Sequence, residues 1–116
     1  MVKVYGIKNC TTVKNALAWL DENKIEYTFY DFKKDGVSEK DFRTWLKYYP
    51  WNILINQKSH TWKGLTEKER KIIKDDDSAI QIGIEKPSII KRPVVVSGKK
   101  ILLGFNKEEY KELFKK

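Results

Sequence analysis

The chain has 116 residues, of which 41% are hydrophobic and 13% aromatic, and lysine and arginine outnumber aspartate and glutamate by 24 to 16. This length fits one domain, and the composition excludes an intrinsically disordered chain. No apolar run reaches the ~20 residues needed to span a bilayer, so no membrane association is expected.

The formal charge of +8 would attract either nucleic acids or small anions. The lysines are scattered among acidic residues, and no basic run is interleaved with aromatic residues. We therefore expect an anionic substrate rather than direct nucleic-acid binding. We also expect no bound metal or cofactor, and a monomer.

The first thirty residues predict a strand, a helix and a second strand. Residues 2–5 form a β-type run, which we interpret as a strand rather than as part of a signal peptide. Apolar residues from Val13 to Leu20 recur at i, i+3, i+4 and i+7, as on one face of a helix. Residues 25–30 alternate apolar with polar, and a crossover of this length makes the two strands parallel.

The middle of the chain predicts short helices. A turn at residues 34–36 precedes a helix that Ser38 caps and Pro50 stops, and residues 51–54 form one further turn. The polar residues 56–61 are typical of a loop.

Two more helices are predicted before the last third. Thr66 and Glu69 have the spacing of a capping box. Asp75–Asp77 place negative charge where a helix N-terminus favours it, and Pro87 marks the helix end. The isoleucines between these points alternate, which also permits a strand: Ile80, Ile82 and Ile84. The acidic start and the proline favour a helix.

The C-terminal third predicts a hairpin followed by a helix. Residues 94–96 and 101–103 are apolar and flank a turn at 97–100. Asn106 is typical of an N-cap, with Tyr110 on the buried face of the helix that follows. The order β-α-β … β-β-α predicts an α/β domain, residues 1–116, with one four-stranded mixed sheet.

Cys10 is the only cysteine, so no internal disulfide is possible and a reducing cytoplasm is expected. Free cysteine is among the most buried residue types, and by itself this favours a structural role. Its neighbours favour a reactive thiol instead, because Cys10 lies between a strand and a helix in a polar segment. The polar neighbours are Lys8, Asn9, Thr11 and Thr12.

A reactive Cys10 requires surroundings that stabilise its thiolate form. A thiol of ordinary pKa, ~8.5, is only about 3% thiolate at pH 7, and a helix N-terminus typically contributes ~0.3–1 kcal/mol. We expect the amides around Thr11 and Thr12 to donate hydrogen bonds, and a cation to supply the rest. The candidate cations are Lys8, Lys58 and Arg92. His60 is expected at the surface.

Val13 stands where a Cys-x-x-Cys motif would have its second cysteine. A mixed disulfide at Cys10 must therefore be resolved by an external thiol, for which glutathione is the natural small candidate and glutaredoxin a protein candidate. Arg92-Pro93 precedes a predicted strand, where proline is tolerated. If this bond is cis, it would present Arg92 towards Cys10.

Four segments resemble the arsenate-reductase-like ArsC/Spx/YffB family, most closely its YffB branch. They are Tyr5–Cys10, Leu54–Trp62, Ile90–Val94 and Leu103–Phe105. Each segment is modest alone, but their order and spacing together are specific, and the resemblance covers nearly the whole chain.

The resemblance implies a thioredoxin-like fold with a helical insertion, residues 37–88 approximately, between strands two and three. It implies that Cys10 is the nucleophile, that Arg92 binds an oxyanion or a thiol adduct beside it, and that Pro93 is cis. The implied function is that of a thiol-dependent oxidoreductase, specifically a glutathione-dependent thiol reductase.

The sequence also departs from two branches of this family. Arsenate reductases use three arginines around the cysteine; Arg92 matches one, while Lys58 and Phe105 stand near the places of the others. A histidine four residues before the cysteine in those enzymes is Gly6 here. Spx proteins bind the RNA polymerase alpha subunit and sense redox state with a cysteine pair that Val13 removes. Arsenate reduction and Spx-like regulation therefore stay as alternatives.

Overall fold

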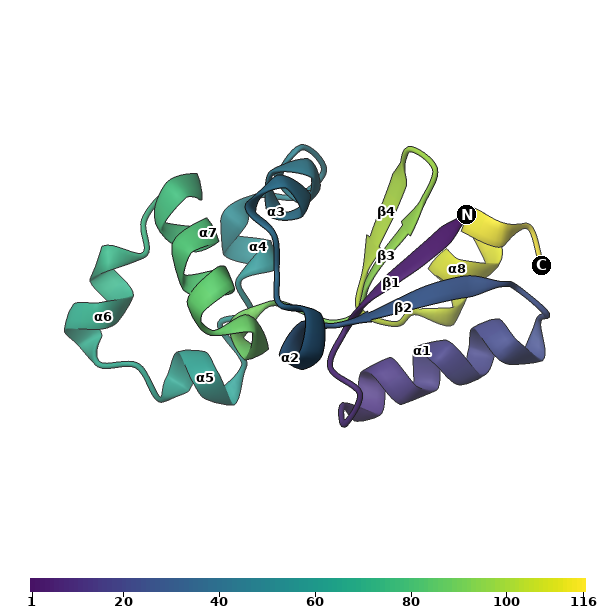
Figure 1. Cartoon of the computed structure of the whole chain (residues 1–116), viewed down its shortest axis with the longest axis horizontal. Coiled ribbons are helices and arrows are strands. Elements are labelled where there is room, and N and C mark those ends of the chain that lie inside the picture. The colour runs from purple at the N-terminus through teal and green to yellow at the C-terminus, as the bar shows by residue number, and fades with distance from the viewer. The chain divides into compact units, whose positions relative to one another are not determined.

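A computed structural model describes all 116 residues, which divide into two compact units. The first, here called the sheet unit, contains residues 1–34 and 92–116. The second, the helical unit, contains residues 35–91 (Figure 1). Cys10 and Arg92 both belong to the sheet unit, so the topology of that unit decides how they are placed.

The sheet has four strands in the order β2-β1-β3-β4. β1 (Val2–Gly6) pairs in parallel with β2 (Tyr27–Asp31) and antiparallel with β3 (Val94–Ser97), which forms a hairpin with β4 (Lys100–Leu103). The predicted mixed sheet, its parallel first pair and its C-terminal hairpin are confirmed. The strand and helix order is that of a thioredoxin-like α/β fold.

Two helices pack on one face of this sheet. α1 (Thr11–Glu22) contributes Ala16, Trp19 and Leu20 to the core, and α8 (Lys107–Phe114) contributes Tyr110. They meet the alternate residues of the strands that point to this face: Val2, Val4 and Val95. The predicted helical spacing in the first helix is confirmed, because it places these apolar side chains on one stripe.

Tyr110 connects α8 to the end of the sheet. Its side chain is 1% exposed, and its hydroxyl donates to the backbone oxygen of Gly104 at 2.7 Å. Its ring packs edge-on against Trp19, at 5.6 Å between centroids, and against Phe105 at 5.0 Å. Burial and then the charge of Glu109 raise the pKa of Tyr110, so its hydroxyl stays protonated as a donor.

Removing the Tyr110 hydroxyl tests this connection. Tyr110→Phe keeps the ring packing but leaves the buried Gly104 oxygen without its partner, which should lower the free energy of unfolding by about 1–2 kcal/mol. Urea unfolding followed by circular dichroism measures the change. Tyr48→Phe is the matched control because Tyr48 is 46% exposed; equal losses in both variants would contradict the role assigned to Tyr110.

The helical unit lies between β2 and β3 in the chain, as the resemblance implies for an insertion. α2 (Phe32–Asp35) forms the junction, and the remaining helices follow in this order: α3 (Glu39–Leu46), α4 (Trp51–Leu54), α5 (His60–Lys63), α6 (Glu67–Ile72), α7 (Asp76–Glu85) and the 3-10 helix η1 (Pro87–Ile89). The predicted cap at Ser38 is confirmed, since its side chain accepts from the Asp41 amide. The capping box of Thr66 and Glu69 is also confirmed.

Three short segments differ from the predictions. Residues 34 and 35 belong to α2 instead of forming a turn, and Gly36 follows the helix in the left-handed conformation with φ +73°. α3 ends at Leu46, before Pro50, and the amides of Lys47 and Tyr48 tighten its last turn by bonding three residues back, to the Thr44 and Trp45 oxygens. Residues 60–61 belong to α5 instead of a loop, because the Ser59 side chain accepts from the Trp62 amide and caps a single turn.

The segment with the alternating isoleucines, for which the sequence permits either a helix or a strand, is helix α7. Its N-terminus carries a capping box between Asp75 and Ser78. Ile80 is buried and Ile82 is only partly buried, because residues two apart on a helix point in different directions. Ile84, near the C-terminal end of α7, is 42% exposed. No helix of the chain has the length and apolar composition that a membrane span requires.

Within the helical unit, two backbone segments run side by side just before the chain returns to Arg92. Ile55 and Ile90 form an isolated antiparallel bridge. The Asn56 amide donates to the Ile89 oxygen and the Lys91 amide to the Leu54 oxygen, each at 2.8 Å. These bonds hold the backbone of the residues that directly precede Arg92.

Candidate functional site

Cys10 is the N-cap residue of α1, with an extended backbone at φ −113° and ψ 125°. The preceding loop, residues 7–9, leads directly from the end of β1, so the sulfur lies where a strand ends and a helix begins. The side chain is half-buried, and the first turn of α1 contains no acidic residue. The unpaired amides of the helix start therefore face Cys10 with no competing carboxylate on their own turn.

The sheet brings Arg92 to this place from far along the chain. β1 and β3 are antiparallel, with Tyr5 opposite Val94, so the start of β3 lies beside the end of β1. Arg92 and Pro93 come just before that start. The Arg92-Pro93 peptide bond is cis, which confirms the expectation from the resemblance. From this position, the hydrogen bonding and the positive charge of the Arg92 side chain both act to lower the pKa of Cys10.

These surroundings favour the thiolate of Cys10. Partial burial acts to raise the pKa, but it is outweighed by hydrogen bonding from the Val13 amide, by the hydrogen bond and charge of Arg92, and by the Thr12 amide. The net effect is that the pKa of Cys10 lies below its ordinary value. The Cys10 side chain makes no capping hydrogen bond of ordinary geometry, and the influence of the Val13 and Thr12 amides is to lower the pKa of the thiol.

The helix start supplies its amides one position later than the sequence predicts. The sequence indicates donors around Thr11 and Thr12, whereas the structure assigns this role to Thr12 and Val13. The reason is the geometry of an N-cap, whose side chain accepts from the second or third helical residue and not from the first. In the sequence, Val13 is notable only because it stands where a Cys-x-x-Cys motif would have its second cysteine. Its apolar side chain gives no indication that its backbone amide lowers the pKa of Cys10.

The other predicted polar residues of this segment lie at the surface. Lys8, Asn9, Thr11 and Thr12 are exposed, which leaves the approach to Cys10 polar. Of the charged side chains in the sheet unit, Arg92 is the cation that lowers the Cys10 pKa.

Two further residues of interest belong to the helical unit. Lys58 is exposed on the turn between α4 and α5, where its backbone amide donates to the Asn56 side chain at 3.0 Å. His60 is exposed at the start of α5, which confirms its predicted surface position. No group of three or more histidine, cysteine, aspartate or glutamate side chains is arranged to hold a metal ion.

This arrangement can support one covalent step at sulfur. Cys10 provides a nucleophile with an ionised form stabilised by two amides and a guanidinium. Val13 is fully buried and apolar, so no second thiol of this chain can attack a disulfide at Cys10. Any covalent adduct must leave by reaction with a thiol from outside.

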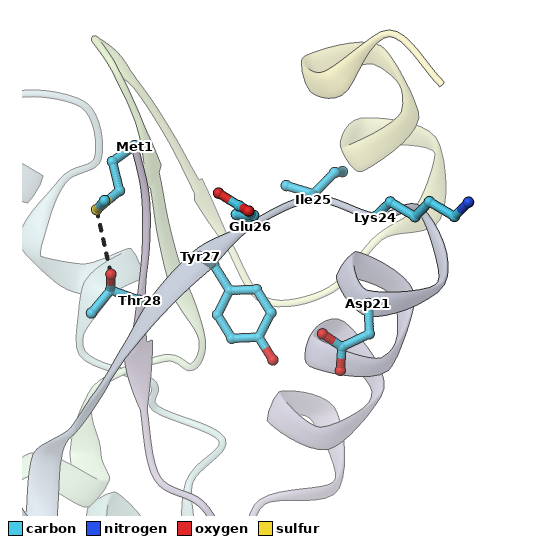
Figure 2. A pocket seen from close by; sticks show the side chains of 7 residues that line it. All are labelled: Met1, Asp21, Lys24, Ile25, Glu26, Tyr27 and Thr28. Carbon is cyan, nitrogen blue, oxygen red and sulfur yellow. Dashed lines mark hydrogen bonds between the residues drawn. The ribbon is translucent and has the colours of Figure 1, made fainter.

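A separate cavity lies at the opposite end of α1, away from Cys10. Its volume is about 780 Å³, and it is lined by Met1, Asp21 and residues 24–28. Figure 2 shows the Tyr27 ring pointing towards Asp21, whose charge and hydrogen bond add to burial in raising the pKa of Tyr27. The cavity contains no nucleophilic thiol and no cluster of cations, so it does not extend the Cys10 site.

The chain is similar in sequence and in fold to several known proteins. The model of the ArsC family matches residues 5–113. An uncharacterized protein of Haemophilus influenzae is 39% identical over 114 residues, which cover 98% of this chain and 99% of that protein. Global transcriptional regulator Spx 2 of Bacillus anthracis is 25% identical, with 97% and 86% covered. A solved structure of a YffB protein superposes with a TM-score of 0.91 at 37% identity, covering 97% of both chains.

Proposed function

Because the chain belongs to the ArsC family, we propose that it is a thiol-dependent oxidoreductase, specifically a glutathione-dependent thiol reductase with Cys10 as its single nucleophile. The observation that carries this proposal is the hydrogen bond and charge of Arg92 on the Cys10 sulfur. A cysteine with only a structural role needs no such partner. The proposal places the protein in a reducing cytoplasm, where glutathione supplies the second thiol.

The proposed reaction consists of three thiol–disulfide exchanges. The Cys10 thiolate attacks one sulfur of an oxidised substrate, forms a mixed disulfide and releases the other sulfur as a thiolate, which takes a proton from water. A glutathione thiolate then attacks the substrate sulfur of the mixed disulfide and regenerates the Cys10 thiolate. The first glutathione leaves bonded to the substrate sulfur, and a second glutathione thiolate attacks the glutathione sulfur of that disulfide, which releases the substrate thiol and forms oxidised glutathione. Two glutathiones therefore supply the two electrons that reduce the substrate, and Cys10 is unchanged after one cycle.

The pH dependence of alkylation tests whether Cys10 is activated. Since the pKa of Cys10 is lowered, its reaction with iodoacetamide should be half-maximal below ~8.5, the ordinary midpoint of a free thiol. Reactivity should fall as the pH falls through the Cys10 pKa, because only the thiolate reacts. Intact-mass spectrometry measures the rate without interference, as Cys10 is the only cysteine. A midpoint at or above that of free cysteine would remove the basis of the proposal.

An Spx-like regulatory function is the second candidate, and the similarity to Spx 2 favours it. In that case the chain would bind the RNA polymerase alpha subunit, and binding would survive Cys10→Ser. The reductase activity would not survive this change. Cys10→Ser therefore separates the two functions in a single pair of assays.

Arsenate is the less favoured substrate. Phe105 packs edge-on against Tyr110 in the core instead of offering a cation. A side chain at Gly6 would have no room, because its Cβ would lie 2.9 Å from Val13 Cγ2. In the sequence, a lysine, Lys58, stands near the place of a second arginine, and a lysine is a point charge without the bidentate fork of a guanidinium.

A further inference from the structure

Gly6, the last residue of β1, lies where a side chain would overlap α1. A Cβ placed there would lie 2.9 Å from Val13 Cγ2, 3.6 Å from Val13 Cγ1 and 3.8 Å from Pro93 Cα. The backbone of Gly6 is not in the left-handed region, which in this chain holds three other glycines. Space, and not backbone conformation, therefore makes glycine necessary at this position.

Val13 cannot easily move out of this space. It is fully buried, and it is the third residue of α1. A β-branched side chain in a helix is held in one strongly preferred rotamer, so rotation about χ1 does not relieve an overlap. A side chain at position 6 would instead displace the backbone of the first helical turn.

That backbone carries the amides that face Cys10. The Thr12 and Val13 amides lower the pKa of Cys10 from the first turn, while Arg92 acts from the segment just before β3. Gly6 lies between Val13 and Pro93, so its missing side chain sets how closely the helix start approaches the Arg92-Pro93 segment. Three parts of the chain converge at one glycine.

We propose that Gly6 and Val13 are a pair of positioning residues, in which the Val13 side chain fills the space that a side chain at position 6 would need and so holds the first turn of α1 beside Arg92. This inference rests on the proposed function, since it concerns the same thiol. It assigns Val13 a role in place of the second cysteine: its side chain fixes the helix start, and its amide faces the nucleophile.

The test compares the Gly6→Ala variant with a double variant by the pH dependence of Cys10 alkylation. Gly6→Ala should displace the helix start and move the alkylation midpoint upward by about one pH unit, the scale of one lost hydrogen bond to a charged group. In the double variant Gly6→Ala/Val13→Ala, the methyl group introduced at position 6 takes the place of the removed valine methyls. Its midpoint should return to within about a third of that shift from the wild-type value.

Gly83→Ala is the matched control. Its Cβ would lie 2.6 Å from Phe42 Cε2 in the helical unit, so it creates the same kind of overlap among Phe42 and Ile90. It should lower thermal stability while leaving the Cys10 midpoint unchanged. The charged groups of the segments around Cys10 are Arg92, Lys8 on the preceding loop and Lys14 on α1, and all three are retained in every variant.

Each outcome decides the inference. A folded Gly6→Ala variant with the wild-type midpoint, or a double variant shifted as far as Gly6→Ala, overturns it. If Gly6→Ala does not fold, the double variant must fold with a midpoint near that of the wild type, and its failure to do so also overturns the pairing. A wild-type midpoint at the value of free cysteine would instead count against the proposed function.

Discussion

Replacing Cys10 with serine is expected to abolish both the mixed disulfide with oxidised glutathione and all reductase activity. In the wild-type protein the Cys10 thiolate attacks oxidised glutathione, gains one glutathionyl group and releases one glutathione thiolate. A serine hydroxyl is not ionised near neutral pH and forms no disulfide. Intact-mass spectrometry measures the adduct, and oxidation of glutathione in a coupled assay with a small mixed-disulfide substrate measures turnover.

The Cys10→Ser variant is close to isosteric, so it should keep the fold, which circular dichroism and thermal unfolding can check. Thr12→Ser is a suitable companion, since it alters an exposed side chain on the same turn and leaves its amide in place. Two results would contradict the proposed function. One is the absence of an adduct on the wild-type protein, and the other is equal turnover by wild type and Cys10→Ser.

Replacing Arg92 with methionine should produce the second large effect. The change removes both the hydrogen bond and the positive charge that favour the Cys10 thiolate, so the pKa of Cys10 should rise. A hydrogen bond to a charged group contributes ~1.5–3 kcal/mol, and the half-buried site places the expected effect at the low end. This corresponds to about a tenfold slower alkylation at pH 7. The rate at pH 10, where the thiol is ionised in both proteins, should be nearly equal.

Two further variants make the Arg92 result specific. Arg92→Lys keeps the charge without the planar fork, so its alkylation rate at pH 7 should fall between those of wild type and Arg92→Met. Lys91→Met removes the same charge one residue earlier, from an exposed side chain, and should alter the rate by less than about twofold. If Lys91→Met slowed the reaction as much as Arg92→Met, general charge and not the specific contact would be responsible.

The longer elements could be predicted because local patterns determine them. The first helix has a regular apolar stripe, the hairpin has two β-branched or aliphatic runs around a glycine turn, and the cap at Asn106 has its partner three residues on. Short helices are different. α5 depends on one serine cap and α2 on a single turn, and neither contains enough residues for a periodicity to emerge.

The site was harder to predict than the fold. Cys10 and Arg92 are far apart in the sequence, and only the antiparallel pairing of β1 with β3 brings them together. Local patterns do not indicate that pairing. The residues alone therefore offer Arg92 only as one of three candidate cations, and the family resemblance implies its role and the cis proline. The amide of Val13 could not be found from residue types, because every residue but proline has one. The constraint at Gly6 depends on the approach of α1, which is evident only in three dimensions.

The contacts of Cys10 also affect the mixed disulfide that would form there. A disulfide sulfur carries no charge, so the contribution of Arg92 and the helix amides to the ionised sulfur is lost when an adduct forms. The reduced protein should therefore be more thermally stable than its glutathionylated form, and the difference should widen as the pH rises from below the Cys10 pKa towards the ordinary thiol value. The same stabilisation makes Cys10 a good leaving group in exchange. The mixed disulfide should therefore react readily with an external thiol. Its lifetime would be set by the concentration of that thiol rather than by a motion of the chain.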